Sequence, residues 1–272
     1  MADLLCTICY SQKRKNLLIL LKEGPKTWEE IKTVLEVTST GMLPQIKILE
    51  DEKLVCKKGK KYALTELGEL VAHFLEPLNK TLGVLEKEKK FWQNHDINAL
   101  PKEFLLRIGE LGNIQILESK DEQIYESHKE FRDILEHSTW VKGITHMVHP
   151  IYPDLFLSLA KKGIDTTLIL TRNVFEIVAA NYRPQITKWL EYDNAHLYVY
   201  DGEIKFSYIT TEKYLSMTFF YSNGIFDTKR DLISVDPSAV KWGEDLFAYF
   251  RERSRSVKNL EDEINRSLHE KR

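Results

Sequence analysis

The chain has 272 residues, of which 43% are hydrophobic and 29% charged, and its formal net charge is −2. This composition excludes a disordered or collagen-like chain, and the length suffices for a small domain and a larger one. The sequence has no uninterrupted apolar run of about eighteen residues and no basic segment before its short apolar N-terminal stretch. We therefore expect a cytoplasmic protein with no membrane partner.

Three cysteines are too few to indicate a disulfide framework. Cys6 and Cys9 form one CxxC motif, but a structural zinc site needs about four ligands and the sequence supplies no second pair. We predict that both are buried in the first helix, with a redox or shared-metal role as the alternative. Burial is also the prediction for Cys56, and we expect no metal and no cofactor.

Residues 11–22 predict a helix that is polar at its start and apolar afterwards, and Gly24-Pro25 ends it. A second helix is predicted from Trp28 to Leu35, because apolar residues recur there at spacings of three and four. Thr27 precedes this helix and can serve as its N-cap. Together with the helix that follows, these segments predict a three-helix core.

The third helix is predicted to begin at about residues 40–42, because a proline such as Pro44 is tolerated within a first turn. Leu43, Ile46 and Leu49 are predicted to face inward. The side chains left on the other faces are short polar or apolar groups, an amide and a cation, which suit base edges and phosphates in a major groove. These candidate DNA contacts are Ser39, Thr40, Met42, Gln45 and Lys47.

Two short apolar runs, 54–56 and 62–65, flank a basic loop that contains one glycine. This pattern predicts a β-hairpin, and beside a recognition helix such a wing can hold DNA phosphates. Taken alone, the same basic run has the alternative of an ordinary solvated turn. The lysines of the loop are Lys57, Lys58, Lys60 and Lys61.

Charge is distributed unevenly along the chain. Residues 11–65 hold twelve Lys or Arg and seven Asp or Glu, which gives +5, so the remainder must carry −7 to reach the total of −2. This asymmetry indicates a nucleic-acid-binding head on an acidic body, with double-stranded DNA as the expected partner.

Residues 66–92 predict a long helix with an apolar seam, which Pro77 is expected to kink or end. The seam either packs within its own domain or pairs with the same helix of a second subunit. A homodimer is favoured, because helix-turn-helix proteins commonly read two half-sites by two-fold symmetry. A polar linker is predicted to follow at 87–90 and 94–96.

From Leu100 onward, predicted strands and helices alternate and a run of strands follows, which indicates a mixed α/β sheet covered by helices. Asp201-Gly202 is predicted to join two of the strands. The predicted helices are 100–111, 123–137, 152–161, 174–180, 185–190 and a last one from Asp236 to at least Arg253. The predicted strands are 114–117, 141–148, 165–170, 197–200, 205–210 and 214–221.

The fold class expected is thus α/β, or α+β overall. A winged helix-turn-helix occupies residues 1–66, a helical linker or dimerisation segment 67–99, and an α/β effector domain 100–272.

A ligand site is predicted where strands end, because ligands of open α/β sheets bind beyond the carboxyl ends of the strands. Arg172 could there hold a carboxylate or phosphate of a small-molecule effector. Ordinary hydrogen-bonded histidines are favoured over a metal site. The residues expected at this edge are His146, His149, Thr171 and Arg172.

The segments SQKRKNLLILLKEGPKTWEEI, LPQIKILEDEKLV and ALTELGELVA resemble an archaeal winged helix-turn-helix regulator of the broad ArsR type. The segments KGITHMVHPIYPDLF, GIDTTLILT and LYVYDGEIKFSYITTEKYLSMTFF resemble the effector domain of the methanogenesis and filamentation regulators of methanogenic archaea. The resemblance implies a DNA-binding transcriptional regulator whose C-terminal domain senses a small molecule or mediates assembly. It implies no particular ligand.

The predicted layout after residue 100 is also similar to phospholipase-D-like folds, which need a histidine nucleophile with a lysine two residues later. Of the eight histidines, only His269 has such a lysine, at Lys271. No Gly-rich phosphate loop or nucleophile elbow occurs either. We therefore expect no enzyme. The alternatives are a phosphodiesterase-like enzyme with a degenerate site and a protein-interaction module.

Overall fold

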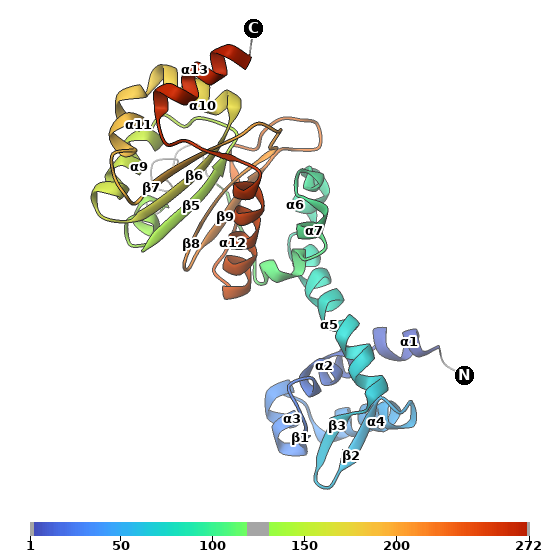
Figure 1. The fold of residues 1–272 in the computed structure, drawn as a ribbon. Coiled ribbons are helices and arrows are strands. Elements are labelled where there is room, and N and C mark those ends of the chain that lie inside the picture. The colour runs from blue at the N-terminus through green and yellow to red at the C-terminus, as the bar shows by residue number, and fades with distance from the viewer. Residues whose placement is uncertain (1–2, 119–130, 271–272) are drawn as a thin grey trace. The chain divides into compact units, whose positions relative to one another are not determined.

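The computed structural model describes residues 3–118 and 131–270, and the chain divides into two compact units (Figure 1). The smaller unit is Met1–Lys80 and the larger unit is Thr81–Arg272. Both helices and strands are present, so the predicted mixed α/β class is confirmed. None of the helices in the described ranges combines the length and the apolar character that a membrane crossing requires.

The helices are α1 (Leu4–Cys9), α2 (Gln12–Leu21), α3 (Trp28–Leu35), α4 (Ser39–Asp51), α5 (Glu66–Lys87), α6 (Lys89–Asn94), α7 (Lys102–Leu105), α9 (Tyr152–Lys161), α10 (Arg172–Asn181), α11 (Arg183–Trp189), α12 (Pro237–Glu252) and α13 (Leu260–Glu270), with short 3₁₀ turns η1 (Ile97–Ala99) and η2 (Ile108–Leu111). Residues 131–136 are also helical, whereas the start of the helix predicted for 123–137 lies outside the described residues. The strands are β1 (Lys26–Thr27), β2 (Val55–Lys58), β3 (Lys61–Leu64), β4 (Gln115–Glu118), β5 (Trp140–Thr145), β6 (Asp165–Thr171), β7 (Ala195–Tyr200), β8 (Phe206–Thr211), β9 (Leu215–Phe219), β10 (Arg230–Ser234) and β11 (Arg255–Ser256).

The smaller unit places α2, α3 and α4 around one apolar core, with a small antiparallel sheet of order β1-β3-β2 beside them. The predicted order of three helices followed by a hairpin is therefore present. The core residues include Leu17, Leu18, Ile31, Ile46 and Leu49. These residues recur at helical spacing, so each helix has one apolar face. Burial of that face against the other helices supplies most of the stability of each helix.

The cysteines of the smaller unit are free thiols. Cys6 is half-buried and Cys9 is exposed, because Thr7 and Ile8 form the buried side of α1. The prediction that both are buried is therefore wrong for Cys9. Cys56 on β2 is half-buried.

α5 continues through Pro77, so the possibility that this proline ends the helix is excluded. A proline inside a helix removes one backbone hydrogen bond, and the remaining turns on both sides keep their own. The chain leaves helical geometry only at Glu88, whose φ of −127° and ψ of 48° separate α5 from α6. Helix α6 then occupies part of the segment predicted to be a polar linker.

The larger unit is built on an eight-stranded sheet of order β11-β7-β6-β5-β8-β9-β10-β4. Strands β5, β6 and β7 are mutually parallel, and their neighbours on both sides pair antiparallel. One face packs against α9, α10, α11 and α13, and the other against α12 and the short helices before β4 (Figure 1). The predicted mixed sheet covered by helices is confirmed.

The strand order corrects one prediction. β7 and β8 do not form a hairpin through Asp201-Gly202, because β6 and β5 lie between them in the sheet. The chain instead crosses from one side of the parallel strands to the other, and the carboxylate of Asp201 accepts hydrogen bonds from Arg172 and Arg255. β10, β11 and α13 were not predicted from the sequence, and α13 follows α12, which was predicted to be the last helix.

We predict opposite effects for two glycine substitutions in α5. A Cβ on Gly68 would lie 1.9 Å from the carbonyl oxygen of Leu54, which is backbone and cannot move aside, so Gly68→Ala should destabilise the smaller unit by about 1–3 kcal/mol. At Gly83 the described residues leave the space within 4 Å of the new methyl group open, so Gly83→Ala should stabilise the helix by roughly 0.5–1 kcal/mol. Thermal melting followed by circular dichroism measures both, and equal effects would contradict the close approach of α5 to Leu54.

Candidate nucleic-acid interface

Local capping sets the geometry of α3 and the turn after it. The Oγ1 atom of Thr27 accepts from the Glu30 N–H at 3.3 Å, while the Glu30 carboxylate accepts from the Thr27 N–H at 2.6 Å. These bonds form a capping box, and the bonds that the carboxylate accepts from the Thr27 N–H and hydroxyl lower the pKa of Glu30. Glu36 ends α3 in the left-handed region, with φ of 50°, and Thr38 then caps α4 by accepting from the Gly41 N–H.

α4 begins at Ser39, earlier than the predicted start at residues 40–42. Pro44 consequently lies inside the helix, beyond its first turn. The sequence prediction started from the rule that proline is confined to a first turn. The cap by Thr38 and the burial of one face of α4 stabilise the helix enough to offset the cost of Pro44 inside it.

Met42 was predicted to approach DNA bases, but it is completely buried in the core of the smaller unit, and this prediction is wrong. Leu43, predicted to face inward, is 42% exposed. Two adjacent apolar residues made the rotation of the helix ambiguous, since either one continues a helical spacing with Ile46 and Leu49. The structure resolves the ambiguity in favour of Met42.

The exposed face of α4 therefore differs from the predicted one. Ser39, Thr40 and Lys47 are exposed, and Leu43 and Pro44 join them. Lys47 also pairs with Asp51 at 2.8 Å one turn later, and a surface pair of this kind is weak enough to exchange partners. This face presents a hydroxyl pair, two apolar side chains and a cation.

Gln45 has partners within the smaller unit. Its Oε1 atom accepts from the Arg14 guanidinium at 2.5 Å and from the Ser11 hydroxyl at 3.4 Å. Arg14 also donates to the backbone carbonyl of Thr7, so it links α1 to α4. The amide oxygen of Gln45 thus has a positioning role that sequence analysis could not foresee, because the partners lie 31 and 34 residues away.

Lys13 is a cation at this surface that the sequence prediction did not single out. It comes from α2, and its Nζ donates to the carbonyl oxygen of Gly41 in the first turn of α4 at 3.3 Å. A Cβ on residue 41 would lie 2.6 Å from that Nζ, so the glycine leaves room for the lysine chain. The exposed ammonium of Lys13 therefore lies beside the start of the exposed face of α4.

The basic loop forms the predicted hairpin. β2 and β3 pair from Val55–Leu64 to Lys58–Lys61, which leaves Gly59 and Lys60 as a two-residue turn. Gly59 has φ of 63°, a conformation that favours glycine. All four lysines, Lys57, Lys58, Lys60 and Lys61, are exposed, and among the described residues no carboxylate forms an ion pair with them.

The carboxyl edge of the parallel strands holds the residues predicted as a ligand site. β5 ends at Thr145, so both histidines follow the strand instead of lying on it. His146 Nδ1 lies 2.9 Å from the Ser207 hydroxyl, and its ring packs against Phe220 and Phe226. Burial lowers the pKa of His146. Thr171 is buried beneath the start of α10.

Arg172 is engaged by two carboxylates of the larger unit. Its Nη1 lies 2.7 Å from Glu263 on α13, and its Nη2 lies 2.8 Å from Asp201 after β7. An incoming anion would therefore have to displace one of these partners. Within the described ranges, His, Cys, Asp and Glu side chains do not gather in groups of three or more that could hold a metal ion.

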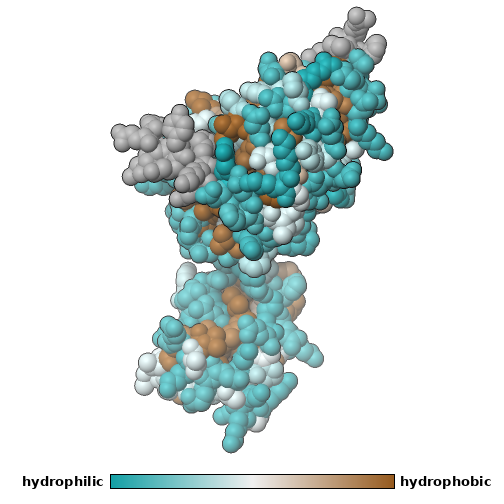
Figure 2. Space-filling view, turned by 90° about the vertical axis from the view of Figure 1, so that its left-hand side faces the viewer, coloured by the Kyte–Doolittle hydropathy of each residue, from teal (hydrophilic) through white to brown (hydrophobic). Residues whose placement is uncertain are grey.

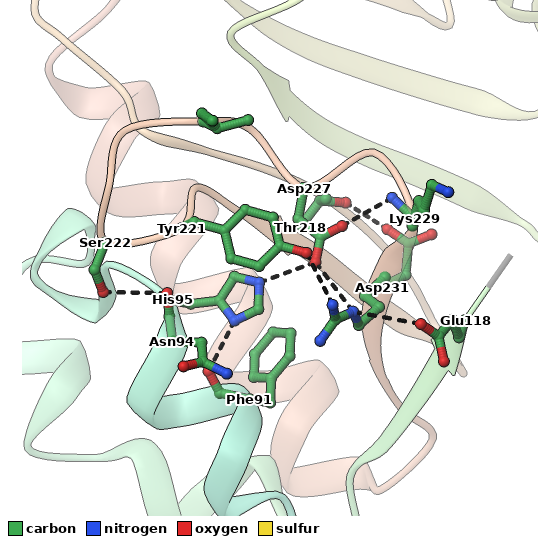
Figure 3. A network of polar contacts seen from close by, with 12 residues as sticks. Phe91, Asn94, His95, Glu118, Thr218, Tyr221, Ser222, Asp227, Lys229 and Asp231 are labelled. Atoms are coloured by element: carbon green, nitrogen blue, oxygen red, sulfur yellow. Dashed lines mark hydrogen bonds and ion pairs between the residues drawn. The ribbon is translucent and has the colours of Figure 1, made fainter.

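A buried polar network fixes the segment after α6 to the sheet (Figure 3). The ring of His95 is stacked between those of Phe91 and Tyr221, with centroids 4.0 Å and 4.7 Å away. Its Nδ1 lies 2.8 Å from the carbonyl oxygen of Phe91, and its Nε2 lies 3.1 Å from Oδ2 of Asp227. Neighbouring backbone bonds, such as Asp96 N–H to the Phe220 carbonyl, continue the attachment.

Asp227 is the centre of this network and is 1% exposed. Burial would raise the pKa of Asp227, but hydrogen bonds from the Lys229 N–H, Tyr221 and His95, together with the charge of Arg230, hold it below the ordinary value. The carboxylate is thus ionised inside the protein. Sequence analysis placed His95 in a polar linker, because its aspartate partner lies 132 residues away.

The fold and these surfaces define a class of protein that joins a small basic helical unit with a β-hairpin to a larger mixed α/β unit. Two domain models of one family match the chain: the N-terminal domain of methanogenesis regulatory protein FilR1 over residues 3–83, and its middle domain over residues 124–253. Between them the matches cover well over half of the chain. The chain therefore belongs to the family of methanogenesis regulatory protein FilR1.

A curated relative and two solved structures are similar to the chain. Methanogenesis regulatory protein FilR1 of Methanothrix harundinacea (strain 6Ac) is 26% identical over 251 residues, which are 91% of this chain and 56% of that protein. The chain thus spans a little over half the length of this relative. The archaeal chromatin protein TrmBL2 has a TM-score of 0.42 at 14% identity, over 89% of this chain and 93% of its own. Phosphatidylserine synthase of Haemophilus influenzae Rd KW20 has a TM-score of 0.45 at 9% identity, over 55% and 41%.

We predict that Asp227→Asn destabilises the larger unit by about 1.5–3 kcal/mol at pH 7, because the hydrogen bonds to a buried charge are removed. The pKa of Asp227 is lower in the folded chain than in the unfolded chain. Its contribution to the free energy of unfolding is therefore complete above about pH 4 and is lost as the pH falls further. The difference between wild type and variant should therefore shrink toward pH 3. Denaturant unfolding followed by tryptophan fluorescence measures this.

A matched control for that experiment is Asp193→Asn, which changes an exposed carboxylate in the turn before β7. Its effect should stay within about 0.5 kcal/mol at either pH. If Asp227→Asn behaved like this control, the buried network would not stabilise the larger unit.

Proposed function

We propose that the chain is a homodimeric DNA-binding transcription regulator. In this proposal, residues 1–66 form a winged helix-turn-helix of the ArsR type, residues 67–99 serve as a linker and dimerisation segment, and residues 100–272 form an effector domain. The observation that carries it is the exposed face of α4 beside a hairpin whose four lysines have no carboxylate partner among the described residues. The name of the curated relative, a methanogenesis regulatory protein, supports a regulatory role.

The two surfaces would have different tasks on DNA. On α4, the hydroxyl groups of Ser39 and Thr40 can bond to base edges or phosphates, and the apolar Leu43 can contact a thymine methyl group. Lys13, beside the first turn of α4, and Lys47, in its second half, can reach phosphates or guanine. Gln45 would contribute mainly through its amide NH₂, since its oxygen already accepts from Arg14. The hairpin lysines would add affinity for any sequence.

A second copy of the chain would cover an apolar stripe on α5. Figure 2 shows apolar side chains reaching a mostly hydrophilic surface in the smaller unit. Leu67, Leu70, Phe74 and Leu78 recur at spacings of three and four on one helical face, and each is at least half exposed. A stripe of this kind can pair with its own copy, and two copies would present two α4 helices to two half-sites.

The larger unit would sense a small molecule and would not catalyse a reaction. The histidines that a phosphodiesterase would need are placed for structure: His95 is enclosed by Phe91 and Tyr221, and His146 packs between Phe220 and Phe226. The ring of His95 is thus closed to a substrate phosphate, and Nδ1 of His146 is engaged by the Ser207 hydroxyl. We expect the unit to act through binding, in the cytoplasm where its DNA is.

The role of the hairpin is tested by replacing Lys57, Lys58, Lys60 and Lys61 with alanine. Binding to all DNA sequences should weaken alike, and the slope of log K against log salt concentration should fall by about one for each phosphate that the hairpin no longer neutralises. Fluorescence anisotropy over a salt series measures both quantities. A control variant with the same change in net charge replaces four exposed lysines of the larger unit: Lys89, Lys161, Lys188 and Lys258. An equal reduction of affinity in both variants would refute a specific role of the hairpin.

The role of the α5 stripe is tested by Phe74→Glu. Phe74 is 68% exposed, so the change should leave the fold intact while placing a charge in the proposed interface. Sedimentation equilibrium should show a dimer for the wild type and a monomer for the variant at micromolar concentration. Leu106→Glu, at a residue 74% exposed in the larger unit, is the control and should remain dimeric. A wild-type chain that is monomeric would exclude this interface.

A further inference from the structure

The larger unit contains a cavity of about 50 Å³ on the face of the sheet that carries α9, α10 and α11. It lies against β5, β6 and β8 and extends to the segment that follows the carboxyl end of β5. The volume is several times the roughly 10–15 Å³ that a single water needs, by the same measure. A cavity of this size in a closely packed interior leaves room for a small ligand.

The wall of the cavity is almost entirely apolar. Leu168 and Leu170 of β6, Val174 and Val178 of α10, and Trp189 of α11 form much of it. The indole N–H of Trp189 is already bonded to the Thr166 hydroxyl at 3.0 Å, so only the apolar part of that ring is offered. A lining of this kind offers water few hydrogen-bond partners and favours hydrocarbon groups.

A glycine contributes to the floor of the cavity. A Cβ on Gly143 would lie 3.0 Å from Cδ2 of Leu168 and 3.3 Å from Cγ1 of Ile209, which is tighter than ordinary contact. Glycine in the middle of a strand costs stability, and it often marks a place where another group approaches the backbone. Here the groups that approach are the side chains of Leu168 and Ile209 from the two neighbouring strands, and both also line the cavity.

One polar group of the lining has the capacity to bind a ligand. In the described part of the chain no hydrogen-bond partner is found for the Tyr152 hydroxyl, at the start of α9. Burial raises the pKa of Tyr152 to about 12, so the hydroxyl keeps its proton at neutral pH and can donate it. His149 also lines the cavity, and its Nδ1 accepts from the Ile151 N–H at 3.4 Å.

Within residues 3–118 and 131–270, neither lysine nor arginine lines the cavity. Arg172 pairs with Asp201 and Glu263, and Lys142 on β5 pairs with Glu244 at 2.9 Å. An anionic ligand in the cavity would therefore give up its hydration without gaining an opposite charge from these residues, which is costly. The sequence-based expectation of a carboxylate or phosphate held by Arg172 does not fit this cavity.

We propose that the cavity binds a small, uncharged, mostly hydrocarbon molecule that carries one hydrogen-bond acceptor, which the Tyr152 hydroxyl engages. This inference rests on the proposed sensor role of the larger unit and specifies the chemical class that it senses. The apolar wall favours hydrocarbon groups. The described lining contains no arginine or lysine, so it disfavours anions. The phenol hydroxyl favours a ligand with a carbonyl or ether oxygen.

The test is methyl NMR of the full chain with two probes of similar shape, cyclopentanone and cyclopentane, and with butyrate as the anion. Both neutral probes should shift the methyl signals of Leu168, Leu170, Val174 and Val178 and leave those of Leu232 on the other face of the sheet unchanged. Removal of the Tyr152 hydroxyl should weaken binding of the ketone about threefold to tenfold, which is the loss expected for one hydrogen bond. Butyrate should produce no shift at these methyl groups.

Two variants separate the polar contact from the apolar space. Tyr152→Phe should show this weaker binding of the ketone and leave the affinity for cyclopentane unchanged. Val178→Phe should fill the cavity and abolish both. If neither neutral probe shifted the lining methyl groups, if butyrate bound best, or if Tyr152→Phe bound the ketone as tightly as the wild type, the proposal would be overturned.

DNA affinity of the same samples, with and without cyclopentanone, distinguishes this proposal from the proposed function. Shifts at the lining methyl groups together with a changed DNA affinity would support both. The same shifts in a chain that binds no DNA at all would support the ligand class of the cavity and overturn the regulator.

Discussion

The rotation of one helix determines what the smaller unit can offer to a partner. α4 buries Met42, Ile46 and Leu49 against α2. Because the side chains are fixed around the helix axis, the buried face also determines which residues are exposed. Each fully buried side chain of this size contributes about 1.5–3 kcal/mol, far more than any single surface contact. The core therefore sets the rotation, and Thr40 and Lys47 reach the surface as a consequence.

Elements with strong local signals could be predicted from the sequence, and long-range pairings could not. The bounds of α3 and α9 follow from helical spacing, together with the Thr27 cap at the start of α3 and a proline in the first turn of α9, which neighbouring residues alone supply. The rotation of α4 was predicted wrongly because Met42 and Leu43 are adjacent and both apolar. The order of strands in the larger unit, and the bonds of Gln45 to Arg14, depend on partners that no local pattern specifies.

The larger unit uses its polar groups unevenly. On one side of the sheet, His95 and Asp227 are sealed among aromatic rings and hold the chain entering the unit in place. At the carboxyl edge of the parallel strands, Arg172 is occupied by an ion cluster. The cavity beside α9 and α10, in contrast, is lined mostly by apolar side chains and includes Tyr152. The charged residues named above stabilise the fold, which is why our proposal assigns ligand binding to the apolar cavity.

α1 is connected to α4 through hydrogen bonds of Arg14. Arg14 donates to the Thr7 carbonyl with one end of its guanidinium and to Gln45 with the other, so a displacement of α1 pulls on α4 through a single rigid, planar group. The half-buried and exposed thiols of Cys6 and Cys9 lie on that same short helix. A shift of α1 would thereby reach α4 through two side chains, those of Arg14 and Gln45.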